Sequence, residues 1–400
     1  MSGSNRIRNE EETPIHISSQ DISWPFWPVV PLYPYSQRRT LLKEVVKDTI
    51  WTFEQCQGIF YVVVPIRMTV VKLAKGGLLV YAPVAPTREC IRLVNELVVT
   101  HGEVKYIILP TVSGIEHKVF VGPFARCFPK AQVFVSPDQW SFPLNLPLSW
   151  LGLPQKRTQK LPLESHKTPF ADEFDYAILG PLDLGLGIFE EVAFYHKRSH
   201  TLLLTDSIIS IPATPPDIVQ LDPYPLLFHA RDNALETIED TLQNRIKGWQ
   251  RIVLFALYFR PNALRTVNWG QVLKESLKSP ERSKKAYFGL FPFEWDDSWK
   301  LSFEKLHRHP LFVAPILQGV ILNRNPLDVL SWVDGVSKWR FERIISAHFH
   351  VPILAHPEQF RQAFDCLRHP QYNLGNKDFE LIQNIDQSLT KIGVVPPSKL

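Results

Sequence analysis

Cysteine is scarce in this sequence of 400 residues, and its four copies stand far apart. Cys56, Cys90, Cys127 and Cys366 form no C-x-x-C pair. Their number and spacing argue against a disulfide framework and against a zinc site built from thiolates. Free thiols of this kind are typical of a reducing compartment.

Long apolar runs and blocks of like charge are missing as well. The longest apolar candidate, residues 58–84, is interrupted by Arg67, Lys72 and Lys75, so it indicates successive strands and not a membrane span. The first residues, MSGSNRIRNEEE, are polar and acidic, unlike a signal or transit peptide. We therefore expect a cytoplasmic protein, either free or peripheral to a membrane. The formal charge of +4 is small and unclustered, so no nucleic-acid partner is expected.

Proline, in contrast, is abundant, with 34 residues in a chain where about 20 are usual. Residues 1–22 are predicted to be disordered, and WPFWPVVPLYPY follows between Trp24 and Tyr35. Proline at every third or fourth position excludes a helix there and favours an extended path. Two interpretations stay open: a strap packed across the domain, or a segment that docks on a protein partner or a membrane surface. Aromatic side chains suit both.

The hydrophobic pattern predicts strands first and strand–helix–strand units next. Apolar runs within residues 50–84 indicate consecutive strands, and Thr87 is a plausible N-cap of a helix that ends before Gly102. A strand VKYIILP, a helix over residues 117–127 and a strand AQVFVSP follow. Three further strands are FDYAILG, EVAFYHK and TLLLTDS, and RIISAHF is a late strand between two helices. This order predicts an α/β fold.

These elements and three motifs resemble the metallo-β-lactamase family, an αββα sandwich of two mixed sheets. In that family a loop after a central strand carries His-x-His-x-Asp-His, a later strand ends in Thr-Gly-Asp, and a His ends a late strand. The corresponding segments here are TVSGIEH, LLLTDS and RIISAHFH. The resemblance implies that Glu116, His117, Asp206 and His348 are metal ligands, with His350 as the second choice for the last position.

The departures from the family pattern are systematic. Val112 and Gly114 occupy the two earlier His positions, and residues 167–195 contain no His. All three His ligands of the family's first metal position are thus absent, and Glu116 replaces an Asp of the second. What is left is a degenerate half-site that could hold one Zn, Fe or Mn ion, or no metal. The long separation of Asp206 from His348 implies an insertion at about residues 211–340, which could form a lid.

A closer resemblance is carried by longer stretches, among them WPFWPVVPLYPY, LPTVSGIEHKVFVGPFAR and KGWQRIVLFALYF. They are similar to the domain of unknown function 4336, a branch of the metallo-β-lactamase superfamily found in photosynthetic lineages. The likeness is dense over about residues 22–265. It implies one metallo-β-lactamase-like domain over residues 23–400, and it implies no activity.

Several candidate residues also have a purely structural interpretation. Glu116 and His117 fit the start of a helix, and Asp206 could cap a turn. His229 and Arg231 lie in the sequence HARD, where they could clamp the carboxylate or phosphate of a substrate. A structural pair between Arg231 and an Asp is the alternative.

Two classes of function stay open at this point. One is a non-catalytic binding or assembly factor that keeps the scaffold. The other is a mononuclear metal-dependent hydrolase or oxygenase-like enzyme, in which the metal lowers the pKa of a bound water. The sequence has no G-x-S-x-G, P-loop or Rossmann glycine motif, so those chemistries are not indicated. Metal content separates the two classes.

Overall fold

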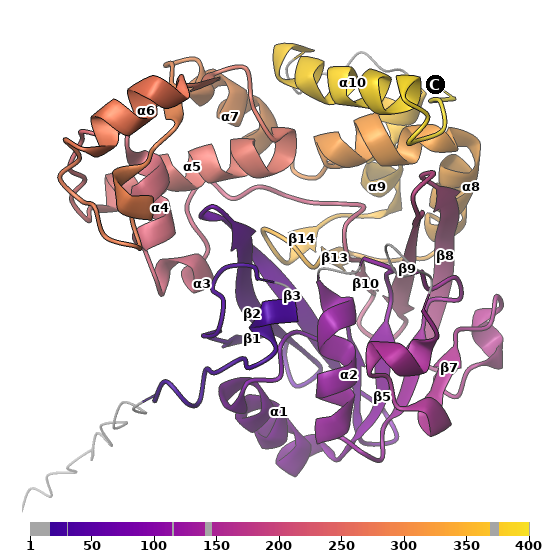
Figure 1. Ribbon diagram of the computed structural model, residues 1–400. Coiled ribbons are helices and arrows are strands. Elements are labelled where there is room, and N and C mark those ends of the chain that lie inside the picture. Colours follow the sequence, from indigo (N-terminus) through magenta and orange to yellow (C-terminus); the bar gives the residue numbers. More distant parts are fainter. Residues whose placement is uncertain (1–16, 30, 114–115, 141–145, 369–375, 400) are drawn as a thin grey trace, which may run out of the picture.

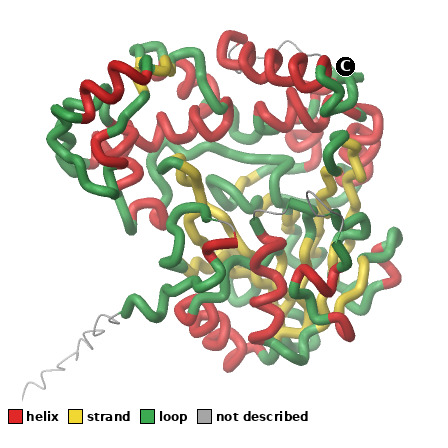
Figure 2. Tube along the Cα trace, in the orientation of Figure 1, coloured by secondary structure: helices red, strands yellow, loops and turns green. Residues whose placement is uncertain are grey.

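The computed structural model describes residues 17–29, 31–113, 116–140, 146–368 and 376–399. Two sheets lie face to face, with helices on both outer sides (Figures 1 and 2). The first sheet has seven strands in chain order: β1 (Leu41–Val46), β2 (Ile50–Ile59), β3 (Val62–Lys72), β4 (Leu78–Tyr81), β5 (Val104–Leu109), β6 (Gln132–Val135) and β7 (Thr158–Lys160). The second has the order β14-β13-β10-β9-β8: β8 (Phe174–Asp183), β9 (Ile188–His196), β10 (Thr201–Leu203), β13 (Arg343–Ile345) and β14 (Ile353–Leu354).

Both sheets are mixed. Strands β1 to β4 pair antiparallel, whereas β4 to β7 pair parallel. In the second sheet β10 pairs parallel with β13, and its other pairs are antiparallel. The longest hairpin is formed by β2 and β3, whose register runs from Ile50↔Val71 to Ile59↔Val62.

The helices form two outer layers. Helices α1 (Arg88–His101) and α2 (His117–Cys127) pack against the first sheet. The others follow β10: α3 (Asp217–Gln220), α4 (Tyr224–Ala230), α5 (Leu242–Tyr258), α6 (Trp269–Ser276), α7 (Trp299–His307), α8 (Pro326–Val336), α9 (Pro357–Ala363) and α10 (Asn376–Lys391). A small hairpin, β11 (Leu264–Thr266) and β12 (Phe293–Trp295), lies among them. Residues 211–340 therefore supply most of these helices, of which α3, α4 and α5 contact the β2–β3 hairpin and α8 contacts β8 of the second sheet.

Alternating side chains on each strand produce the layers. On β5, Ile107 and Leu109 join the core under α1 and α2, while Ile108 faces the second sheet. On β9, Phe194 enters the core between the sheets, and Ala193 enters the core beneath α5 and α8. The predicted αββα sandwich of two mixed sheets is confirmed by this arrangement.

Local signals in the sequence placed several boundaries well. The Thr87 side chain accepts a hydrogen bond from the Cys90 amide (3.2 Å), and Gly102 ends α1 with a φ of 94°. The helix predicted over residues 117–127 is α2. The apolar run RIVLFALYF, which periodicity could not assign, belongs to α5.

The proline-rich segment after the N-terminus packs as a strap. Trp24 is buried against Phe120 of α2, with ring centroids 5.4 Å apart, and the Tyr33 amide donates to Gly58 O (2.8 Å). Of the residues predicted to be disordered, 1–16 lie outside the described part, and 17–22 form turns in which Asp21 O accepts from the Glu89 amide. Among the described residues, no helix has the length and apolar character needed to cross a membrane.

Candidate metal centre

Three side chains from distant parts of the chain meet where strands of the two sheets end. Glu116 follows β5 and immediately precedes α2, Asp206 follows β10, and His348 follows β13. Because β10 and β13 run parallel and are paired, their carboxyl ends lie at the same edge of the second sheet. One ligand atom from each of the three residues lies within 4.8 Å of the other two.

His348 occupies the centre of this cluster. Its Nε2 lies 3.1 Å from Asp206 Oδ1 and 3.5 Å from Glu116 Oε2. Its Nδ1 lies 2.9 Å from Pro65 O on β3, a carbonyl that can only accept a hydrogen bond. Nδ1 therefore carries a proton, and Nε2 is the nitrogen directed at the carboxylates. Metal-binding imidazoles are commonly oriented by such a second hydrogen bond.

The pKa values of His348 and Glu116 depend on the charges of the neighbouring side chains. Burial alone would lower the pKa of His348, but Glu116 and Asp206 raise it well above its usual value. Burial opposes ionisation of Glu116, yet the neighbouring imidazolium holds the pKa of that carboxyl below its usual range. Without a metal, the cluster is thus an imidazolium held between two carboxylates.

His117 shares this arrangement but stands slightly apart. It is buried at the first position of α2, and its Nδ1 lies 3.0 Å from Pro83 O. Its Nε2 is buried and has no hydrogen-bond partner in the described part of the chain. Burial lowers the pKa of His117, so the imidazole is neutral with a free lone pair on Nε2. The His117 ligand atom lies outside the 4.8 Å set.

The loop that carries His348 is held by a buried guanidinium that sequence reasoning missed. Arg67 on β3 donates to Ser346 O (2.6 Å) and Phe349 O (2.8 Å), on either side of His348. The same guanidinium binds Glu54 Oε1 through its Nε and Nη2 at 3.0 and 2.7 Å. Arg67 therefore fixes the position of His348 without touching it.

The loop that carries Asp206 is held in a comparable way by Glu191. This buried carboxylate accepts from the amides of Thr205 (2.6 Å), Asp206 (3.2 Å) and Ser207 (3.0 Å). Burial, together with the charge of Asp206, raises the pKa of Glu191 to about 7. Burial also raises the pKa of Glu190 to about 7. Sequence reasoning also missed Glu190 and Glu191, although two adjacent carboxylates inside the apolar strand FEEVAFY could have indicated that both have a special role.

The second-choice ligand His350 lies outside the cluster, and Val112 occupies one of the two positions where the family has an earlier His. His350 follows the bend at Phe349, and its amide donates to Ser210 O (3.0 Å), so His348 and not His350 supplies the imidazole. Val112 is buried next to β9, where its amide donates to Glu190 O. Gly114 lies outside the described residues.

The two clamp candidates lie in a different cluster, around α4 and α5. His229 is buried, and its Nε2 lies 3.1 Å from Phe60 O at the tip of the β2–β3 hairpin. The Arg231 guanidinium lies over the rings of Phe228 (4.5 Å) and Phe291 (4.6 Å). Among the described residues, no hydrogen bond or ion pair joins His229 or Arg231 to Glu116, Asp206 or His348.

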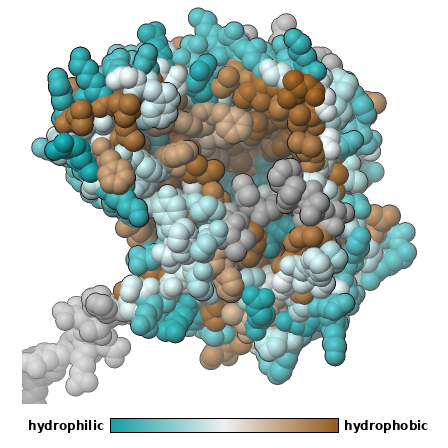
Figure 3. Space-filling view, viewed as in Figure 1, coloured by the Kyte–Doolittle hydropathy of each residue, from teal (hydrophilic) through white to brown (hydrophobic). Residues whose placement is uncertain are grey.

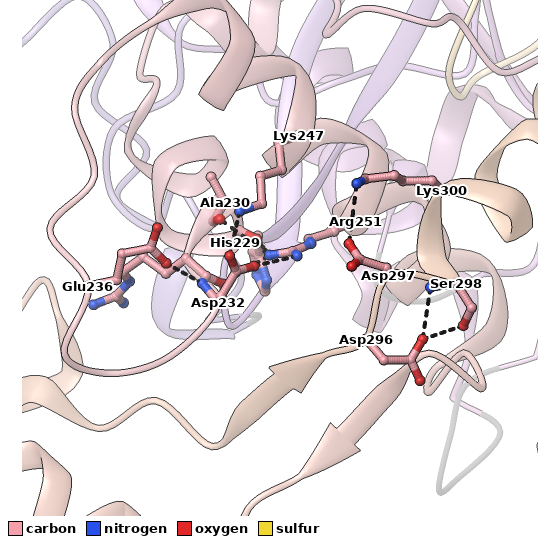
Figure 4. Close-up of polar contacts among 11 residues, drawn as sticks. His229, Ala230, Asp232, Glu236, Lys247, Arg251, Asp296, Asp297, Ser298 and Lys300 are labelled. Carbon is pink, nitrogen blue, oxygen red and sulfur yellow. Dashed lines mark hydrogen bonds and ion pairs between the residues drawn. The ribbon is translucent and has the colours of Figure 1, made fainter.

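The Arg–Asp pair considered for this loop has a different arginine. Asp232 binds Arg251 Nη2 (2.6 Å) and Lys247 Nζ (2.9 Å), as Figure 4 shows. Arg251 also donates through Nη1 to the carbonyls of His229, Ala230 and Arg231, and thereby closes the C-terminal end of α4.

The ligand atoms of Glu116, Asp206 and His348 fit a divalent transition metal ion. Two carboxylates and one neutral imidazole offer oxygen and nitrogen ligands that suit Zn²⁺, Fe²⁺ and Mn²⁺. The buried and unpartnered Nε2 of His117 offers a further nitrogen at the edge of the cluster. An ion bound here would replace the proton on His348 Nε2 and balance the two carboxylates.

The structure resembles solved metallo-β-lactamases and flavodiiron proteins in fold. The DIM-1 metallo-β-lactamase exposed to ceftazidime aligns with a TM-score of 0.37 and 12% identity, over 82% of this chain and 97% of that one. The flavodiiron core of Flv1 from Synechocystis aligns with a TM-score of 0.43 and 10% identity, over 90% and 71%. A mutant of the flavo di-iron protein from Thermotoga maritima aligns with a TM-score of 0.39 and 7% identity, over 82% and 62%.

No curated protein sequence matches the chain. A family model does match: the one described as domain of unknown function DUF4336 covers residues 47–366. This range includes all three residues of the cluster and both sheets apart from the first strand. The chain therefore belongs to the DUF4336 family.

Proposed function

We propose that the protein is a mononuclear metal-dependent enzyme of the hydrolase class, with Glu116, Asp206 and His348 as the ligands of one Zn, Fe or Mn ion. The observation that supports this most is the placement of His348 Nε2 between two carboxylates, with Nδ1 already committed to Pro65 O. Three protein ligands leave coordination positions open, which is the usual arrangement of a catalytic metal site. A bound ion would activate a water molecule as a Lewis acid.

The chain's own residues supply two further functions in this proposal. Arg67 and Glu191 hold the two ligand loops in place through backbone hydrogen bonds. His117 is neutral, buried and unpartnered at Nε2, so it can accept a proton near the cluster or add a fourth ligand. Neither function requires the three His ligands of the family's first metal position.

A second candidate is a non-catalytic binding or assembly factor. It is favoured by one observation: the imidazolium of His348 satisfies both carboxylates without any metal. In that case the cluster is a structural ion pair that ties the two sheets together.

Metal content separates the two candidates. The full-length protein is purified, incubated with Zn²⁺, Fe²⁺ or Mn²⁺, passed through a desalting column and measured by elemental mass spectrometry. We expect about one equivalent in the wild type, loss of the metal in Asp206→Asn and His348→Gln, and retention in the control His350→Gln. Equal metal content in all four proteins, or none in the wild type, would leave only the assembly factor. If metal binds, hydrolysis of ester and phosphodiester substrates by the loaded protein is the test of catalysis.

A further inference from the structure

Helix α6 exposes its apolar side instead of burying it. Trp269, Leu273 and Leu277 follow one another at intervals of four residues, and their exposed fractions are 66%, 58% and 73%. The side that α6 buries consists of Val272 and Ser276. An amphipathic helix of a globular protein normally turns such a stripe toward the core. Figure 3 shows apolar side chains gathered over α6 at the corner of the molecule.

Two turns next to α6 each present an exposed phenylalanine. Phe60 at the β2–β3 tip is 63% exposed and Phe288 is 64% exposed. The two turns are in contact, because Tyr287 lies 6.0 Å from Phe60 between ring centroids. Gly289 in turn lies against Ser276 at the end of α6, where a Cβ would come within 2.9 Å of Ser276 O.

Both phenylalanines occupy backbone positions that favour small residues. The two-residue turn of the β2–β3 hairpin has positive φ at Phe60 (49°) and Tyr61 (62°), a geometry for which Asn-Gly is preferred. Tyr287 and Phe288 also have positive φ, at 50° and 58°. Large aromatic residues are strained in this region, and such strain is found at functional sites. Tyr61 is buried in the aromatic cluster, which explains its presence, but Phe60 and Phe288 point outward.

Basic residues surround these apolar side chains. Five exposed cationic side chains lie on α6 or between α6 and Phe288: Lys274, Lys278, Arg282, Lys284 and Lys285. The acidic side chains among and beside them are fewer, namely Glu275, Glu281 and Asp222, the last of which lies 3.6 Å from Lys285. The surface therefore combines exposed aromatic and aliphatic groups with an excess of positive charge.

We propose that this surface, made of Trp269, Leu273, Leu277, Phe60 and Phe288 with the surrounding lysines, binds an anionic lipid bilayer. A short helix with an exposed apolar stripe and flanking lysines is the pattern of an interfacial membrane contact. The phenylalanines extend from turn tips, where they can enter the headgroup region, and the cations attract acidic headgroups. None of the residues of the proposed metal site belongs to this surface, so lipid binding is independent of the proposed function.

Flotation with lipid vesicles tests the proposal on the full chain. Vesicles of phosphatidylcholine are compared with vesicles that also contain phosphatidylserine. We expect the protein to float with the phosphatidylserine vesicles and bind the neutral ones more weakly. Leu273→Ser/Leu277→Ser should lower the partition coefficient by about tenfold or more, because two leucines no longer enter the interface. Lys278→Glu/Lys284→Glu should weaken binding to the acidic vesicles more than to the neutral ones.

A matched control uses two apolar residues that are more exposed than Leu273 and Leu277 but lie on other helices. Val99 on α1 is 88% exposed and Leu327 on α8 is 77% exposed. Val99→Ser/Leu327→Ser should float like the wild type. The proposal is overturned if the wild type binds neither kind of vesicle, if the α6 double variant floats as well as the control, or if sedimentation velocity shows that the same surface joins two copies of the chain. All substitutions are at exposed positions, so circular dichroism should show an unchanged fold.

Discussion

The Arg251 cluster and the cluster of Glu116, Asp206 and His348 both hold buried charges beside loops, but they use their polar atoms differently. Arg251 on α5 directs four hydrogen bonds to three carbonyls and Asp232 at the end of α4, and its charge also lies over the rings of Trp295 and Trp299. In the other cluster, His348 Nε2 lies between two carboxylates and the nearby His117 Nε2 has no partner among the described residues. Among the described residues, Arg251 Nε and Arg231 Nη2 are also buried without a hydrogen-bond partner, so the difference between the two regions is geometric. The contacts of Arg251 close a loop, whereas the ligand atoms of Glu116, Asp206 and His348 converge on one point, which supports the proposal of a ligand site.

The largest expected effect concerns Arg251 and its partners at the end of α4. Arg251→Ala removes the donor to three buried carbonyls, while the half-exposed Asp232 keeps Lys247, so we expect a loss of about 3 kcal/mol in the free energy of unfolding. Urea denaturation measures it. Lys247→Ala is the control, because this lysine is an outer partner of the same carboxylate and should change stability much less. Similar losses of stability in the two variants would show that Arg251 contributes no more than Lys247, the outer partner of Asp232.

The next effect concerns Arg67, which supports the proposed metal centre. Arg67→Lys keeps the charge but cannot reach Glu54, Ser346 O and Phe349 O with one planar group, so His348 loses its fixed position. We expect metal affinity to fall by about 10–100-fold, the usual size of such an effect. Competition with a chromophoric chelator measures it.

A buried arginine elsewhere provides the control for that measurement. Arg324 is also buried and pairs with Asp386, beside α10 and away from the cluster. Arg324→Lys should leave metal affinity unchanged. Equal metal affinities of the Arg67→Lys and Arg324→Lys variants would show that Arg67 does not position His348.

A further effect concerns His229, in the cluster around α4 and α5, and is seen in the pH dependence of the free energy of unfolding. Burial lowers the pKa of His229 to about 3, whereas an unfolded His titrates near about 6.5. Between these values the unfolded chain binds more protons than the folded one, so stability falls as the pH decreases from about 6.5 toward 3. The slope from this residue is at most about 1.4 kcal/mol per pH unit. His229→Gln, which can still donate to Phe60 O but does not titrate, should flatten the acid limb of a stability–pH curve; an unchanged curve would assign that limb to other groups.

The smallest expected effect separates His117 from the three proposed ligands. Its ligand atom lies outside the 4.8 Å set, so His117→Ala should change metal affinity by less than about tenfold, while Asp206→Asn abolishes binding. If the protein is catalytic, kcat should fall in His117→Ala more than metal content does. A complete loss of metal from His117→Ala would instead make it a full ligand.

The sequence predicted the layers and the strand ends because both depend on local patterns. Strand VKYIILP, the strand before Asp206 and the strand before His348 each have an apolar run that ends in a polar residue, and parallel pairing brings two of these ends together. The supporting residues could not be predicted in this way. Arg67 contacts the carbonyls of Ser346 and Phe349, 279 and 282 positions along the chain, and no local pattern encodes such a pair.

The loop HARD shows the opposite case, in which a local pattern gave the wrong partner. Arg231 and Asp232 are neighbours in sequence, yet the aromatic rings of Phe228 and Phe291 enclose Arg231, and Asp232 turns to Arg251 on α5. Adjacent residues of opposite charge have different partners here because α4 ends at Ala230, immediately before them, and its last carbonyls need the donor that Arg251 supplies.

Anomalous X-ray scattering from crystals of the full chain soaked in Mn²⁺ or Zn²⁺ is the most direct test of the metal centre. We expect one strong peak bounded by Glu116, Asp206 and His348 Nε2, with His348 Nδ1 still hydrogen-bonded to Pro65 O. A peak at another place, or none while His348 remains an ion pair with both carboxylates at saturating metal, would contradict the proposed metal centre.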